Sequence, residues 1–175
     1  RRVLFRSANC ASDFELLSNR KDVEGAAERR LNRPTQLEWI SYKALLAIND
    51  LVSIKPNFPM DDEGFPTFTA GSGVADLEAY YSDFNLICEV TMLNNRDQWV
   101  AEGQPVQRHL FEFSRKYSDK EALCIFIAPT LHRDTRNTFK QAFYGGYDEA
   151  DSLKIIPFEF RNWANIVRSL SEAKT

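Results

Sequence analysis

The chain has 175 residues, 43% of them hydrophobic and 27% charged, which is the composition of a globular protein that can bury a hydrophobic core. This composition excludes disordered and collagen-like chains, and no apolar run approaches the roughly 20 residues that a transmembrane helix needs. The net charge is −3, but residues 56–105 carry nine acidic side chains and one basic side chain between mildly basic flanks.

Hydrophobic periodicity and turn residues predict the elements in chain order. Residues 13–31 are helix-compatible, a second helix opens at Pro34-Thr35, and the prolines and glycines of residues 55–73 predict a loop. The later elements that we expect are strands 74–81 and 84–93 around a Ser82-Asp83 turn, a helix from Gln104-Pro105 to Tyr117, a strand 122–129, a helix 132–144, a strand 153–157 and a helix 158–173. This order predicts an α/β sandwich with a mixed central β-sheet flanked by helices.

Cysteine usage indicates a reducing compartment. Cys10, Cys88 and Cys124 are widely spaced and form no Cys-x-x-Cys pair, so we expect neither a disulfide nor a zinc site. The N-terminus begins with Arg1 instead of Met and lacks the apolar core of a signal peptide. We therefore expect the chain to begin inside a longer protein and to be cytoplasmic.

Two carboxylates face each other in the predicted hairpin. If Ser82-Asp83 is a two-residue loop, cross-strand partners have indices that sum to 165, which pairs Asp76 with Glu89. Their Cβ atoms would then be about 5 Å apart, whereas Glu78 would face an apolar partner on the same side of the sheet and is a less certain participant. A longer loop would shift this register.

Such a carboxylate pair favours a divalent cation, because two carboxylates held together repel unless they share a proton or a cation. Oxygen ligands suit Mg²⁺, which takes an octahedral shell at about 2.0–2.1 Å and keeps several waters. The carbonyl of Val90, directly after Glu89, could be a further ligand. Such a metal can activate a water and stabilise the charge that develops on a scissile phosphate. The alternative is a solvent-exposed hairpin face with incidental acids.

The spacing of Asp76, twelve intervening residues and then Glu89-Val90-Thr91 resembles the PD-(D/E)xK nuclease motif. Longer blocks in the same order resemble the AlwI group of type IIS restriction endonucleases: PTQLEW at 34–39, GVADLEAYY at 73–81, FNLICEVT at 84–91, QWVAEGQPVQRHL at 98–110 and IAPTLHRDT at 127–135. The chain is short for a whole enzyme of that group. It is similar to the small subunit of a heterodimeric type IIS endonuclease, whose large subunit recognises DNA and nicks one strand.

The resemblance implies a catalytic site of four acids, which are Glu38, Asp76, Glu89 and Glu102. Asp76 and Glu89 would bind Mg²⁺ together with the Val90 carbonyl. Glu38, on the first core helix, could hold a water that is bound to the metal.

The chain departs from the general motif at one position. Thr91 stands where a Lys is expected, and Thr can supply neither a charge nor a base. Glu102, placed just before the third predicted helix, is the candidate to replace that function.

Three residues of the third predicted helix have two interpretations each. His109 lies among apolar positions, which favours a partly buried, satisfied histidine over a contact to phosphate or water. Gln107 and Arg108 could approach a scissile phosphate or lie on a solvated face.

The resemblance implies a restriction-endonuclease-like α/β sandwich and the activity of a Mg²⁺-dependent type II site-specific deoxyribonuclease of bacteria. We expect one nuclease domain over residues 1–175, without a recognition domain, that cleaves one strand of double-stranded DNA as the small subunit of a two-subunit enzyme. With a pI near 5.5 and no helix-turn-helix, zinc finger or basic stripe, the chain is expected to bind DNA weakly without the large subunit.

Two alternatives stay open. One is a self-sufficient nuclease of the same superfamily that acts in repair or defence. The other is a non-catalytic interaction module of the same fold, which the missing Lys at Thr91 favours and the four acids oppose.

Overall fold

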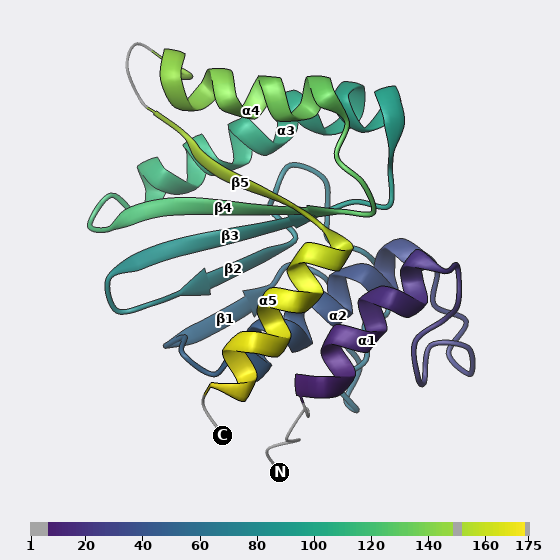
Figure 1. The fold of residues 1–175 in the computed structure, drawn as a ribbon. Helices are drawn as coiled ribbons and strands as arrows, with labels where there is room; N and C mark the ends of the chain where they lie inside the picture. The colour runs from purple at the N-terminus through teal and green to yellow at the C-terminus, as the bar shows by residue number, and fades with distance from the viewer. Residues whose placement is uncertain (1–6, 149–151, 174–175) are drawn as a thin grey trace.

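The computed structural model describes residues 7–148 and 152–173, which form a five-stranded β-sheet with helices on both faces (Figure 1). The elements are α1 (Ser7–Ser18), α2 (Arg33–Ile48), β1 (Ser53–Pro56), β2 (Leu77–Tyr80), β3 (Phe84–Val90), α3 (Asn95–Lys116), β4 (Glu121–Ala128), α4 (Arg133–Gly145), β5 (Lys154–Glu159) and α5 (Phe160–Glu172). The expected α/β sandwich with a mixed central sheet is confirmed.

The strands lie in the sheet in their chain order, β1-β2-β3-β4-β5. β1, β2 and β3 are antiparallel neighbours, whereas β3, β4 and β5 are parallel. Helices α3 and α4 make the two crossovers between the parallel strands, and Figure 1 shows both on one face of the sheet, as two right-handed crossovers in the same direction require. Helices α1, α2 and α5 cover the opposite face.

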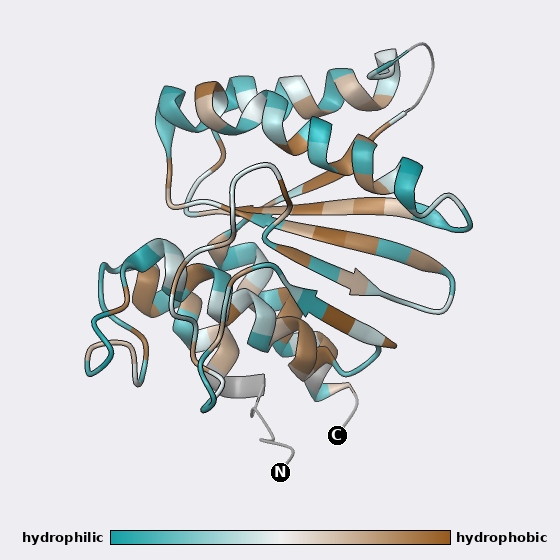
Figure 2. Cartoon of the chain, turned by 180° about the vertical axis from the view of Figure 1, so that it is seen from behind, coloured by the Kyte–Doolittle hydropathy of each residue, from teal (hydrophilic) through white to brown (hydrophobic). Residues whose placement is uncertain are grey.

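Two clusters of buried apolar side chains hold these layers together. Because side chains alternate along a strand, Leu86 and Cys88 of β3 join the cluster beneath α1, α2 and α5, while Ile87 joins the one beneath α3 and α4. Figure 2 shows the hydrophobic central strands between the two helical layers. Cys10, Cys88 and Cys124 are free and buried, as small core residues.

The predicted hairpin register is confirmed. Leu77 pairs with Cys88 and Glu78 with Ile87, so the partner indices sum to 165. The Tyr81 N–H donates to the Phe84 carbonyl at 3.0 Å and closes a two-residue turn. Both strands are shorter than expected, and Asp76 directly precedes β2 in place of a position within it.

The second predicted helix is also confirmed, and a side chain caps it. The Asn32 side chain accepts the Thr35 N–H at 2.9 Å, and Pro34 occupies the first turn, where its missing N–H costs nothing. Asn49 ends the helix in the left-handed conformation, with φ 54°. Helix α2 therefore presents Glu38 near its N-terminal end.

The helix expected over residues 13–31 is wrong in extent, because α1 ends at Ser18 and residues 19–32 form turns. Val23 and Ala26 of this connector are buried. The buried Gln36 side chain accepts the Val23 N–H at 3.0 Å and donates to Asp22 at 2.8 Å. These tertiary contacts outweigh the helix propensity of the connector.

Two other boundaries differ from the sequence prediction. Ser53–Pro56, half of which fell in the expected loop, is an edge strand too short for a visible periodicity. Helix α3 begins at Asn95, well before Gln104-Pro105, because the buried Gln98 side chain donates to the carbonyls of Leu93 and Thr130. Glu102 therefore lies inside α3 and not just before it.

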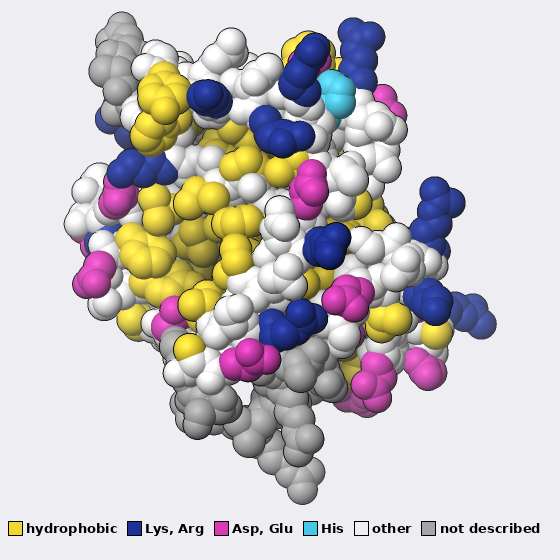
Figure 3. Space-filling model, viewed as in Figure 1, with side chains coloured by type: hydrophobic (Ala, Val, Ile, Leu, Met, Phe, Trp, Pro, Cys, Tyr) yellow, Lys and Arg dark blue, Asp and Glu magenta, His cyan; other side chains and the backbone are white. Residues whose placement is uncertain are grey.

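A groove lies at the sheet edge formed by β5. It has a volume of about 450 Å³ and is lined by Leu123, Arg136, Phe139, Lys140, Phe143, Tyr144, Lys154, Ile155, Ile156 and Pro157. Figure 3 shows hydrophobic side chains gathered on this side of the molecule with basic side chains near them. None of the expected site residues lines the groove. No helix in the described part of the chain is long and apolar enough to span a membrane.

Candidate functional site

The site is built around a loop, residues 57–76, that joins β1 to β2. Asn57 closes the loop at its base: its backbone N–H donates to the Asp76 carbonyl at 3.0 Å, and its side chain donates to the Ala75 carbonyl at 2.7 Å. The loop thus delivers Asp76 to the start of β2, beside the end of β3.

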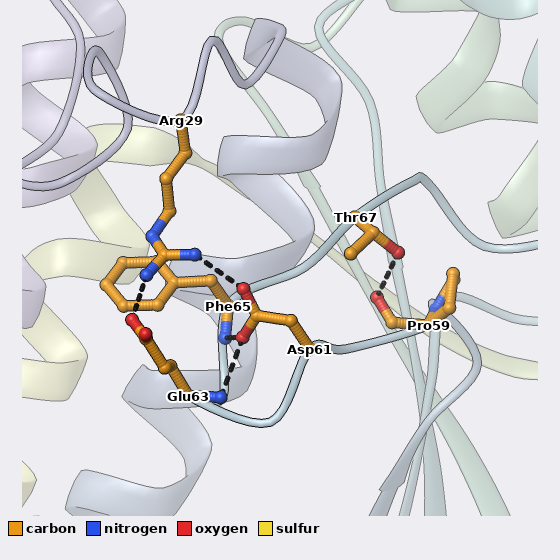
Figure 4. A network of polar contacts seen from close by, with 6 residues as sticks. All are labelled: Arg29, Pro59, Asp61, Glu63, Phe65 and Thr67. Carbon is orange, nitrogen blue, oxygen red and sulfur yellow. Dashed lines mark hydrogen bonds and ion pairs between the residues drawn. The ribbon is translucent and has the colours of Figure 1, made fainter.

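The middle of the loop is attached to the helical layer (Figure 4). Arg29, in the connector between α1 and α2, pairs with Asp61 at 2.5 Å and with Glu63, and its guanidinium lies 3.8 Å from the centroid of the Phe65 ring. Phe65 packs in turn against Trp39 of α2, with 4.8 Å between the ring centroids. These contacts anchor the loop to α2 at Trp39, the residue that follows Glu38.

Glu38 is buried, with 6% of its surface exposed, and its Oε2 accepts the Ala70 N–H from the loop at 2.8 Å. The pKa of Glu38 is raised from 4.5 to about 8, because burial and the neighbouring charge of Asp76 raise it by more than the Ala70 hydrogen bond lowers it. Near neutral pH this carboxyl can both accept and release a proton.

Asp76 and Glu89 come together at the end of the hairpin. The Asp76 carboxylate accepts the Val90 N–H at 2.7 Å, and Glu89, on β3, is 6% exposed. Burial raises the pKa of both groups well above the usual value, and neighbouring carboxylates, Glu89 for Asp76 and Glu102 for Glu89, raise them further. The chain therefore holds the Asp76 and Glu89 carboxyl groups together in a buried site, where their charged forms are unfavourable.

Glu102 reaches the same place from α3. Burial raises its pKa, whereas a hydrogen bond from the Thr91 side chain lowers it, as does the charge of His109 whenever that ring is protonated. Thr91 is 7% exposed, and its hydroxyl oxygen accepts the Leu93 N–H at 3.1 Å. At the position where the nuclease motif has Lys, this chain therefore has the Thr91 hydroxyl, which forms a hydrogen bond with the Glu102 carboxylate.

His109 belongs to this site, a role that the sequence interpretation did not favour. It is a satisfied, partly buried histidine as expected, but its partner is Glu89, with 2.8 Å between Nδ1 and Oε1. Arg108 Nη2 lies 3.3 Å from Nε2. Because Arg can only donate, Nε2 accepts and Nδ1 carries the proton that it donates to Glu89. Burial, with Arg108, lowers the pKa of His109 and favours this neutral form.

A sequence signal for His109 exists once α3 is extended to Asn95. Glu102 and His109 are seven residues apart, about two helical turns, and so lie on one face of α3. Gln107 is buried and donates to the Gly103 carbonyl at 2.5 Å, so it does not lie on a solvated face, whereas Arg108 is exposed.

The site offers carboxylate oxygens, the type of ligand that a hard divalent cation prefers. Asp76, Glu89 and Glu102 each raise the pKa of at least one other acid of the site, so the acids lie close together. Within the described residues, no group of three or more His, Cys, Asp or Glu side chains is arranged to hold a metal ion. Mg²⁺ completes its shell with water around a few protein oxygens, so it can use a smaller set such as the one expected from the sequence, Asp76, Glu89 and the Val90 carbonyl.

The raised pKa of Glu38 predicts a pH-dependent stability. Because its pKa rises from 4.5 to about 8 on folding, its contribution is fully present below about 4.5 and is lost as pH rises through about 8. We expect Glu38→Gln to flatten the fall in the free energy of unfolding over this range, measured by urea denaturation without metal. Glu28→Gln, on an exposed acid, is the control. An unchanged pH profile in Glu38→Gln would contradict the prediction.

Known restriction endonucleases resemble this chain in sequence and in fold. The model of the family described as AlwI restriction endonuclease matches residues 13–166. The crystal structure of the small subunit (R.BspD6I2) of the heterodimeric restriction endonuclease R.BspD6I is similar, with a TM-score of 0.73 and 22% sequence identity. The similarity covers 94% of this chain and 78% of that one. No curated protein matches the chain.

Proposed function

The chain belongs to the AlwI restriction endonuclease family, and from this we propose that it is a Mg²⁺-dependent endonuclease that cleaves one strand of double-stranded DNA. We further propose that it acts as the small subunit of a two-subunit type IIS enzyme, with a large subunit that recognises DNA. The observation that carries the proposal is the convergence of four acids from α2, the hairpin and α3, with raised pKa values. The similarity in fold to the small subunit of a heterodimeric restriction endonuclease supports the proposal that this chain has a partner subunit.

Asp76 and Glu89, with the Val90 carbonyl, are the proposed ligands of the metal. When bound there, Mg²⁺ would lower the pKa of an attacking water and neutralise charge on the phosphate. The chain's own part is to hold these ligands still. The Val90 N–H fixes Asp76, and the His109 ring fixes Glu89.

The other site residues would handle protons. Glu38 has a pKa of about 8, so its carboxylate can take a proton from the attacking water near neutral pH. Glu102, supported by Thr91, lies beside Glu89 and holds water or a ligand there by hydrogen bonding. Nε2 of neutral His109 is a second proton acceptor beside Glu38, and in the free chain it accepts a hydrogen bond from Arg108.

The direct test mixes the chain with a candidate nicking subunit and a plasmid that carries one recognition site. With Mg²⁺ we expect the large subunit to nick the plasmid and the pair to linearise it. With EDTA neither product is expected. A pair that leaves the plasmid nicked in Mg²⁺, while the chain is folded and associated with its partner, would refute the catalytic proposal.

Glu102→Ala is expected to slow second-strand cleavage about 10²- to 10³-fold, the scale of a lost proton-handling group. Thr91→Ala removes one hydrogen bond to Glu102, worth about 1 kcal/mol, and is expected to slow it about tenfold or less. The measurement is the rate at which nicked plasmid becomes linear, with Asp119→Ala, an exposed acid after α3, as control. A larger loss for Thr91→Ala would give Thr91 a direct role.

One observation favours a non-catalytic module of the same fold: Thr91 stands where the motif has Lys. Such a module would assist the large subunit without using its acids. It therefore predicts that neutral replacements of Asp76 and Glu89 leave cleavage unchanged, the opposite of the nuclease proposal.

A further inference from the structure

The four acids of the candidate site make it unfavourable for an anionic substrate. A phosphodiester is an anion, and each of these carboxylates repels it unless positive charge lies nearby. The charges that raise the pKa values of Glu38, Asp76 and Glu89 are those of other acids of the site, and His109, which contacts Glu89, is held neutral. The cation that the nuclease motif places after its second acid is replaced by Thr91.

Arg108 brings a permanent positive charge into contact with the site. Its Nη2 lies 3.3 Å from Nε2 of His109, whose other nitrogen is bonded to Glu89. The chain of contacts therefore runs from Arg108 through His109 to a proposed metal ligand. Next to Arg108, the buried Gln107 holds this turn of α3 in place through the Gly103 carbonyl.

The guanidinium of Arg108 can donate further hydrogen bonds. Its side chain is 49% exposed, and its acidic neighbour, Glu112, lies 4.0 Å from Nε, which is too long for a hydrogen bond. Arg carries five N–H donors in a planar fork that matches two oxygens of a phosphate. An exposed Arg with a poorly engaged fork, beside buried carboxylates, is suited to a phosphate oxygen.

We propose that Arg108 binds a non-bridging oxygen of the DNA phosphodiester that this site cleaves, an inference that rests on the proposed function. In the free chain the guanidinium donates to His109 Nε2. In the complex with DNA it turns its fork to the phosphate, supplies the positive charge that Thr91 cannot, and leaves Nε2 available.

The test uses the reconstituted two-subunit enzyme on a plasmid with one recognition site, and follows conversion of nicked to linear DNA. Arg108→Met is expected to slow this step about 100-fold, the scale of a lost charged contact to the reacting group. Arg108→Lys, which keeps the charge and loses the fork, should recover about tenfold of that loss. Arg161→Met is the matched control, because it removes the same charge from an exposed position of α5, on the other face of the sheet.

Salt dependence distinguishes a phosphate contact from a structural role. Loss of one such contact lowers the slope of log rate against log salt, at low DNA concentration, by about 0.9. We expect this change in Arg108→Met and not in Arg161→Met. Wild-type speed or an unchanged salt slope in Arg108→Met would overturn the proposal.

A double variant separates direct binding from positioning of His109. If Arg108 binds phosphate, Arg108→Met slows cleavage further in a His109→Ala background. If it acts only by holding His109, the second change has no further effect, and the proposal is overturned. A wild-type pair that cannot linearise the plasmid would instead refute the proposed function, so the two failures are distinguishable.

Discussion

Asp76→Asn is expected to reduce second-strand cleavage by about 10³-fold or more, the scale seen when a central catalytic group is removed. The amide keeps the shape of the side chain and its bond from the Val90 N–H, but it loses the ligand charge. The fold should persist, because burial and Glu89 make the Asp76 charge unfavourable in the metal-free protein and raise its pKa. The melting temperature without metal should therefore stay the same or rise.

Glu89→Gln should behave alike in the plasmid assay, since Glu89 also loses a proposed ligand charge. The matched control is Asp83→Asn, which makes the same chemical change in the exposed turn of the same hairpin and should leave cleavage unchanged. Full cleavage by Asp76→Asn would remove the metal-site assignment. A lowered melting temperature together with lost cleavage would point to a structural role instead.

The second large effect expected is dependence on the partner subunit. The isolated chain should be folded, because two apolar clusters pack both faces of its sheet. It should not cleave specific DNA, because its net charge is −3, its acidic centre disfavours a polyanion, and its sequence contains no helix-turn-helix or zinc finger that reads base edges. Cleavage should appear only with the large subunit, at a fixed distance from its recognition sequence.

The measurement is a titration of the large subunit against a fixed amount of this chain. One plasmid carries a single recognition site, and a matched plasmid has that site removed. Linear product should rise with the large subunit on the first plasmid and stay absent on the second. Site-specific double-strand cleavage by the chain alone would instead favour a self-sufficient nuclease.

The hairpin shows what local sequence determines. A two-residue turn between strands of period two leaves one register, so the pairing of Leu77 with Cys88, and the approach of Asp76 to Glu89, could be predicted from spacing. Hydrophobic periodicity depends on residues that are close in the sequence. It therefore predicted the order of strands and helices, and this order predicted the mixed sheet. The ordered blocks of the resemblance indicated the family.

The tertiary structure decided how the remaining site residues meet the hairpin. Glu102 and His109 share a face of α3 with access to Glu89 because that helix starts at Asn95, and its start depends on Gln98 reaching the distant Thr130 carbonyl. Ala70, in a loop without periodicity, donates to Glu38 across 32 residues of sequence. Polar contacts between such distant segments leave no periodic trace, so spacing could place Asp76 and Glu89, while only packing could bring the helices and the loop to them.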